Sequence, residues 1–233
     1  MAIIHASRGE FINASWLIIL AAAFDVLDGV MARITKSSSE FGVEIDSLSD
    51  VISFGAAPAF LVYQAHLFSL GALGILISSL LMIFGGLRLA RFNSQLVGFD
   101  KEHFVGLPIP VSALTVSSFI LSFWSSTNGL GNSAVLLPPL VVVLSLLMVS
   151  KVKYDTLPKI SRRSVQKEPW KYVFLGLAIV VVFATAGGAI LPLFLLFIVL
   201  GLVRYFTGVA SNLLHSGRNR EEEEAAEPSR VDM

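Results

Sequence analysis

Long apolar segments follow one another along most of the chain, and they constrain its fold more than any other feature of the sequence. A helix needs roughly 20 mostly apolar residues to cross the hydrocarbon core of a bilayer. The turn at Ala186-Gly187-Gly188 divides an apolar stretch that is too long for one span. We therefore predict seven membrane-spanning helices, over residues 12–33, 45–68, 71–92, 109–126, 132–150, 170–186 and 189–206.

The composition agrees with a membrane protein and excludes several other classes. Hydrophobic residues make up 55% of the chain, charged residues only 15%, and the mean hydropathy is +0.76. A soluble domain carries about a quarter charged residues, and a disordered chain is far less hydrophobic. The absence of cysteine excludes disulfides, thiolate metal ligands and a cysteine nucleophile. The formal net charge of zero gives no indication of nucleic-acid binding.

The positive charges support this number of spans. If the seven helices alternate in direction, 16 of the 17 lysine and arginine residues fall on one side of the membrane, and only Arg8 falls on the other. Basic residues accumulate in cytoplasmic loops, so that side is predicted to be cytoplasmic. The sequence thus predicts a multi-pass, all-α protein of the cytoplasmic (inner) membrane.

Four aspartates lie within or beside the first two predicted spans, where carboxylates are costly and usually functional. Asp25 and Asp28 are three residues apart, and Asp46 and Asp50 are four apart, so each pair shares one helical face. A short connection lets the two helices pack antiparallel, which brings the four carboxylates together near the cytoplasmic interface. Clustered carboxylates repel one another, and Mg²⁺ or Mn²⁺ resolves that conflict with oxygen ligands. Two ions about 4 Å apart would suit phosphoryl chemistry.

The residues between the aspartates fit the same site. Gly29, Ala32 and Gly42 are small and allow a bulky ligand to approach the helix backbone. Arg33 is a permanent cation that suits phosphate oxygens.

These eight residues resemble the signature of the CDP-alcohol phosphatidyltransferase family, D-x2-D-G-x2-A-R-x8-G-x3-D-x3-D. Every fixed position of that signature is matched, by Asp25, Asp28, Gly29, Ala32, Arg33, Gly42, Asp46 and Asp50. The resemblance implies a helical membrane enzyme that transfers a phosphatidyl group from CDP-diacylglycerol to an alcohol and releases CMP.

The resemblance also implies a role for each residue of the signature. The metal ligands would be Asp25, Asp28 and Asp46, with Asp50 as the general base that also contacts a metal. The CDP-diacylglycerol site would be lined by Gly29, Ala32, Arg33 and Gly42. A homodimer is what the family suggests.

Two further stretches resemble the bacterial phosphatidylserine synthase branch of this family. They are Gly86-Leu-Arg88-Leu-Ala-Arg91-Phe-Asn93 and Phe104-Val-Gly106-Leu-Pro108-Ile-Pro110. Arg88 and Arg91 share a helical face and could bind the carboxylate of L-serine, and Asn93 could add a polar contact. The arginines alone also suit glycerol phosphate or inositol phosphate, or plain anchoring at the interface. The two prolines are expected to set the start of the fourth span.

The predicted organisation has five parts. Residues 1–11 form a remnant of a preceding helix or loop, because the resemblance predicts a further family helix where only 24 residues precede Asp25. Residues 12–150 form the catalytic transmembrane domain, 151–169 a cytoplasmic basic loop, 170–206 a C-terminal helical hairpin and 207–233 a disordered acidic tail.

Two alternatives to an active serine-specific enzyme stay open at this point. A transporter could also use intramembrane carboxylates, although it would not need the nucleotide-sized spacing around Gly29 and Gly42. An inactive homologue is the other alternative, because of the short segment before Asp25.

Overall fold

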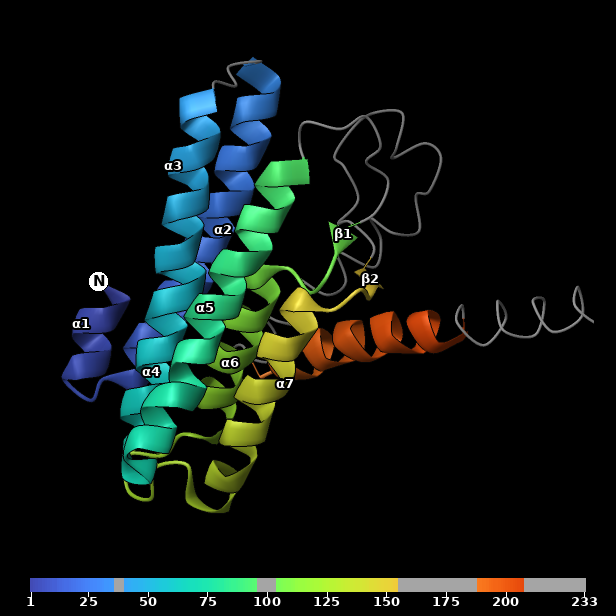
Figure 1. Cartoon of the computed structure of the whole chain (residues 1–233). Coiled ribbons are helices and arrows are strands. Elements are labelled where there is room, and N and C mark those ends of the chain that lie inside the picture. The colour runs from blue at the N-terminus through green and yellow to red at the C-terminus, as the bar shows by residue number, and fades with distance from the viewer. Residues whose placement is uncertain (36–39, 96–103, 155–187, 208–233) are drawn as a thin grey trace, which may run out of the picture.

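The described part of the protein, in a computed structural model, comprises residues 1–35, 40–95, 104–154 and 188–207. It is a bundle of helices with one very short pair of strands (Figure 1). In chain order the elements are α1 (Ala2–Ser7), α2 (Phe11–Thr35), α3 (Glu40–Asp50), η1 (Val51–Ala56), α4 (Ala57–Ala65), η2 (Leu67–Leu70), α5 (Ala72–Gln95), β1 (Phe104–Val105), α6 (Ile109–Phe123), η3 (Gly131–Leu136), α7 (Leu137–Val149) and β2 (Lys153–Tyr154). A further helix covers Ile190–Thr207.

Five helices are long and apolar enough to cross a membrane, and they agree with five of the seven predicted spans. Their bounds are Phe11–Met31, Glu44–Ala65, Ala72–Asn93, Gly131–Val149 and Ile190–Thr207. Their outer faces carry large exposed apolar side chains, which is the surface that lipid requires. The protein is therefore a polytopic helical membrane protein, as predicted. The predicted span over residues 170–186 lies outside the described residues.

The fourth predicted span, over residues 109–126, is shorter in the structure. Helix α6 has 15 residues, which gives a length of about 22 Å. Pro108 is its N-cap and Pro110 lies in its first turn, as expected for residues that set a helix start. Most of α6 is enclosed by other helices, including its hydroxyl residues. Three of these hydroxyls donate to carbonyls three or four residues earlier, from Ser112, Thr115 and Ser118.

The helix that carries two of the four aspartates changes its winding directly after Asp50. α3, η1 and α4 run on without a break, and η1 is a π-helix. Pro58 has no N–H to donate to the carbonyl four residues before it, so the regular hydrogen-bond ladder cannot pass through this point. Gly55 lies in η1 and packs closely on α5, since a Cβ there would sit 3.3 Å from the Cα of Met82.

A two-residue antiparallel ribbon joins the start of α6 to the end of α7. Phe104 pairs with Tyr154, and Val105 with Lys153. Gly106 follows the ribbon with a φ of +88°, and its N–H donates to the carbonyl of Val152 at 2.8 Å. In Figure 1 the ribbon lies at the end of α7 and beside the upper part of α5, and α2 and α3 extend well beyond it.

The helix over Ile190–Thr207, drawn in orange in Figure 1, projects outward from the bundle beside α7, at a steep angle to the other helices. It is attached through Tyr154, whose ring stacks on Phe197 with centroids 5.6 Å apart. Gly201 also faces that ring, since a Cβ there would lie 2.3 Å from the tyrosine Cε1. Burial raises the pKa of the Tyr154 phenol to about 12.

Candidate active site

The first two aspartates lie in the second half of α2. Asp25 is half-buried and Asp28 is exposed, one helical turn further on. Gly29 follows, and a Cβ built on it would meet no atom within 4 Å. This stretch of α2 therefore borders open space. Ala32 and Arg33 belong to the last turns of the same helix, but their side chains lie outside what the structure describes.

The second pair of aspartates lies on α3, which runs antiparallel beside α2 (Figure 1). Asp46 is exposed, and Asp50, the last residue of α3, is half-buried. Gly42 is exposed in the first turn of the helix. The short connection predicted from the sequence thus joins two antiparallel helices, each with one pair of carboxylates.

The charges of the aspartates act on one another across the two helices. Asp25 experiences electrostatic repulsion from Asp46 and Asp28. Asp50 experiences it from Asp25 and Asp46. Asp25, Asp46 and Asp50 are therefore near one another across the two helices, whereas Asp28 acts on Asp25 within α2. Their roles as metal ligands and base stay predictions.

The donor set fits a divalent cation by charge and by atom type. Carboxylate oxygens are the ligands that Mg²⁺ and Mn²⁺ prefer. Within the described residues, no three acidic or histidine side chains are close enough together to hold an ion. Carboxylates that repel one another approach closely when a proton or a cation offsets the repulsion. The number and the identity of the ions stay predictions.

Arg88 lies in α5 beside this region. Its side chain is only 7% exposed, and its charge attracts that of Asp50. A buried guanidinium near a half-buried carboxylate can also donate hydrogen bonds to a second anion. Arg88 is therefore placed where an anionic group of a substrate would also be close to Asp50.

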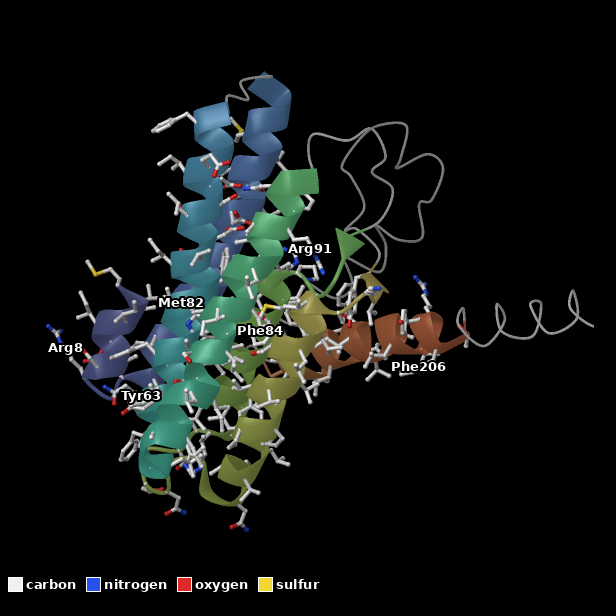
Figure 2. The ribbon with its side chains drawn as sticks, in the orientation of Figure 1. Arg8, Tyr63, Met82, Phe84, Arg91 and Phe206 are labelled. Atoms are coloured by element: carbon white, nitrogen blue, oxygen red, sulfur yellow. The ribbon has the colours of Figure 1, made fainter. Side chains whose placement is uncertain are left out.

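Arg91 and Asn93, the other two residues predicted to contact serine, have bonds to the protein itself. The Arg91 Nη1 donates to the carbonyl oxygen of Val149 at 3.1 Å. The Asn93 Nδ2 donates to the Oγ of Ser47 at 2.9 Å. Figure 2 shows Arg91 projecting from α5 toward the end of α7 and β1. Their contacts with serine stay a prediction, and the described contacts hold helices together.

Ser47 was not predicted to have any role. It follows Asp46 directly and occupies one of the variable positions of the signature. The only sequence feature that pointed to Ser47 was its position, one residue after Asp46 and three residues before Asp50. A long-range partner on α5 cannot be read from that signal, because the contact joins residues 46 positions apart.

Comparison with known proteins gives one family. Residues 1–149 match the model of the CDP-alcohol phosphatidyltransferase family. A CDP-diacylglycerol–serine O-phosphatidyltransferase of Helicobacter pylori is 39% identical over 160 residues, which cover 69% of this chain and 68% of that protein. One of Methanocaldococcus jannaschii is 37% identical over 200 residues, 84% of this chain and 86% of that protein. An archaetidylserine synthase of Methanothermobacter thermautotrophicus is 43% identical over 157 residues, 66% of this chain and 63% of that protein.

Proposed function

The chain belongs to the CDP-alcohol phosphatidyltransferase family, and from this membership we propose that it transfers the phosphatidyl group of CDP-diacylglycerol to the hydroxyl of L-serine. The products are phosphatidylserine and CMP. The observation that carries the proposal is the complete signature on two antiparallel helices, together with relatives that bear the name of this serine transferase.

The reaction breaks a phosphoanhydride bond and forms a phosphoester bond. The serine hydroxyl oxygen attacks the phosphorus that bears the diacylglycerol, a new P–O bond forms, and the P–O bond to CMP breaks. Asp50 takes the hydroxyl proton as general base. Mg²⁺ or Mn²⁺, when bound by Asp25, Asp28, Asp46 and Asp50, supplies positive charge for the pyrophosphate and the departing CMP. Two ions suit this chemistry.

The serine carboxylate would bind Arg88. The Arg88 side chain is buried, and its positive charge attracts Asp50. A small amino acid whose carboxylate is held at the guanidinium would therefore bring its hydroxyl toward the base. CDP-diacylglycerol would lie along the open side of α2 and α3, with Gly29, Ala32 and Gly42 leaving room for it and Arg33 near its phosphates. The acyl chains would stay in the bilayer.

We place the site at the cytoplasmic face of the inner membrane. The end of the bundle that holds the site also holds Arg88, Arg91 and Lys151, which is the charge distribution of a cytoplasmic end. The catalytic domain over 12–150, the basic loop over 151–169, the C-terminal hairpin over 170–206 and the homodimer remain parts of this proposal.

The test uses the purified protein in detergent with CDP-diacylglycerol, Mn²⁺ or Mg²⁺ and labelled L-serine. We expect labelled phosphatidylserine and an equal amount of CMP, both lost when EDTA removes the metal. Asp50→Asn should lower kcat by about 100-fold or more, the range for loss of a general base. Glu44→Gln, an exposed carboxyl on the same helix, is the matched control and should stay active.

Two results would contradict the proposal. Product with glycerol 3-phosphate or inositol phosphate but none with serine would move the enzyme to another acceptor within the family. If no acceptor leads to release of CMP, the chain would instead be a transporter or an inactive homologue.

A further inference from the structure

Helix α3 has little packing to fix its rotation. None of its described side chains is fully buried, and Phe41, Ile45 and Leu48 are among its exposed apolar residues. Its rotation is fixed at one end, where it continues without a break into η1 and α4, and its exposed length can twist at little cost. A lateral contact at the level of the site therefore adds to what holds Asp46 and Asp50 toward α2.

Small rotations of α3 would displace its carboxylate groups by large distances. Side-chain tips lie about 5–6 Å from a helix axis, so a turn of about 20° moves a tip by about 2 Å. Metal–ligand distances tolerate only about ±0.2 Å, and a misplacement of about 1 Å can cost 100-fold in rate. The orientation of α3 is thus a requirement of the proposed chemistry.

A polar bond attaches α3 to α5 at the level of the site. The Nδ2 of Asn93 donates to the Oγ of Ser47 at 2.9 Å, and both residues are half-buried. Ser47 lies between the two carboxylates in the sequence of α3. Fixing its Oγ to α5 therefore fixes the side of α3 that Asp46 and Asp50 present to α2.

The end of α5 is itself anchored. Arg91, two residues before Asn93, donates to the carbonyl oxygen of Val149 at 3.1 Å. Val149 is the last residue of α7, where carbonyls have no partner inside the helix and a positive charge is favourable. A chain of contacts thus runs from α7 through α5 to α3.

We propose that Asn93 is a positioning residue of the transferase, which holds Asp46 and Asp50 in place through Ser47 and does not contact serine. The inference rests on the proposed function, because it assigns a role within the same metal-dependent site. It replaces the direct serine contact that the sequence favoured for Asn93.

The experiment compares Asn93→Ala, Ser47→Ala, the double variant and Ser49→Ala. Ser49 is exposed on the same helix and serves as the matched control. For each variant we measure kcat, the KM of serine, the Mn²⁺ concentration for half-maximal activity, and Mn²⁺ binding to the purified protein by electron paramagnetic resonance. The last measurement needs no turnover.

We expect both single variants to bind Mn²⁺ about 10-fold more weakly or worse, the usual cost of losing a residue that orients metal ligands. The KM of serine should stay within about two-fold of the wild-type value, because binding of the acceptor is not touched. The double variant should bind Mn²⁺ no more weakly than either single variant, since each single variant already removes the hydrogen bond between Asn93 and Ser47. Ser47→Thr, which keeps the hydroxyl, should restore both Mn²⁺ binding and kcat.

Several results would overturn the inference. If Asn93→Ala raised the KM of serine while Ser47→Ala had no effect, Asn93 would be a serine contact. Additive losses in the double variant would mean that the two residues act separately. If an alanine variant is not monodisperse, Ser47→Cys tests the same bond with a weaker acceptor and should give an intermediate loss, so a wild-type value would refute the role. An inactive wild type that binds no Mn²⁺ would refute the proposed function instead.

Discussion

Gly29 follows the second aspartate of the signature, and the space beside it is open. A Cβ there would meet no atom within 4 Å, so Gly29→Ala should fold normally. Alanine within a helix is more stable than glycine by roughly 0.5–1 kcal/mol, so the melting temperature should stay level or rise. If CDP-diacylglycerol lies against this backbone, its KM should rise. Gly86→Ala, also without neighbours within 4 Å, is the control, and an equal change in KM in both variants would argue against a substrate contact.

Gly106, in contrast to Gly29, has no space for a side chain. Its φ of +88° is unfavourable for any L side chain, and a Cβ there would lie 2.2 Å from the carbonyl oxygen of Met148. Gly106→Ala should therefore destabilise the protein by about 1–3 kcal/mol, the usual cost of such backbone strain. Thermal unfolding in detergent measures this, with Gly86→Ala again as the comparison. An unchanged melting temperature would mean that the β1–α6 connection can move away from α7.

The residues of the site differ in how far the sequence could predict them. The four aspartates are recognisable because their spacing alone assigns them to two helical faces, and the structure places the charges of Asp25, Asp46 and Asp50 within reach of one another. Arg91 and Asn93 were predicted only from a local stretch. Their partners, Val149 and Ser47, lie 58 and 46 residues away, and only the folded chain brings them together.

At the scale of elements, the contact between Tyr154 and the helix over Ile190–Thr207 should respond to alkaline pH. An ordinary tyrosine ionises near pH 10, whereas burial raises the pKa of Tyr154 to about 12. Below pH 10 the phenol is neutral in both the folded and the unfolded state. Between pH 10 and 12 it ionises only when exposed, so stability falls as the pH rises.

Comparison of the wild type with Tyr154→Phe isolates this effect. Phenylalanine keeps the stacking on Phe197 and has no proton to lose. Melting temperatures from pH 8 to pH 11 should fall less steeply in the variant, because the other tyrosines contribute equally to both proteins. Parallel curves would show that the phenol reaches water in the folded protein.

Helix lengths show where hydropathy alone is insufficient. Five predicted spans agree with long helices, whereas the fourth gave a helix of 15 residues. A prediction from hydropathy assumes that every apolar helix faces lipid. Helix α6 is instead surrounded by other helices, and its buried hydroxyls donate hydrogen bonds to its own backbone. The π-helix after Asp50 was not predicted either, because periodicity does not reveal hydrogen-bond shifts.

At the scale of the whole molecule, the orientation predicted from the basic residues can be tested directly. The chain has no cysteine, so single cysteines can be introduced without background. In intact cells, Asn128→Cys should react with a membrane-impermeant maleimide. Lys151→Cys should react only after the membrane is permeabilised, since it lies at the opposite end of the bundle. Both positions are exposed. The reverse pattern would place the site on the outer face.

The family predicted from the signature is confirmed by the match over residues 1–149. That prediction succeeded because eight fixed positions fall within a single pair of adjacent helices. The serine acceptor is harder to derive, because the signature itself contains no residue that was predicted to contact serine.

The π-helix after Asp50 makes this segment the place where the span can lose one residue. Each residue of an α-helix turns the chain by about 100°, and a π turn accommodates one residue more than the regular ladder would. Loss of a single codon within Val51–Ala56 would keep the span hydrophobic and nearly as long. It would return the π turn to a regular α-helical turn and keep α3 and α4 in register, whereas loss of a residue from the regular helix on either side would rotate α3 by about 100° relative to α4 and turn the carboxylates away from α2. Single-residue deletions among functional relatives should therefore fall within this segment or in the connections between helices, and not in the regular helix on either side.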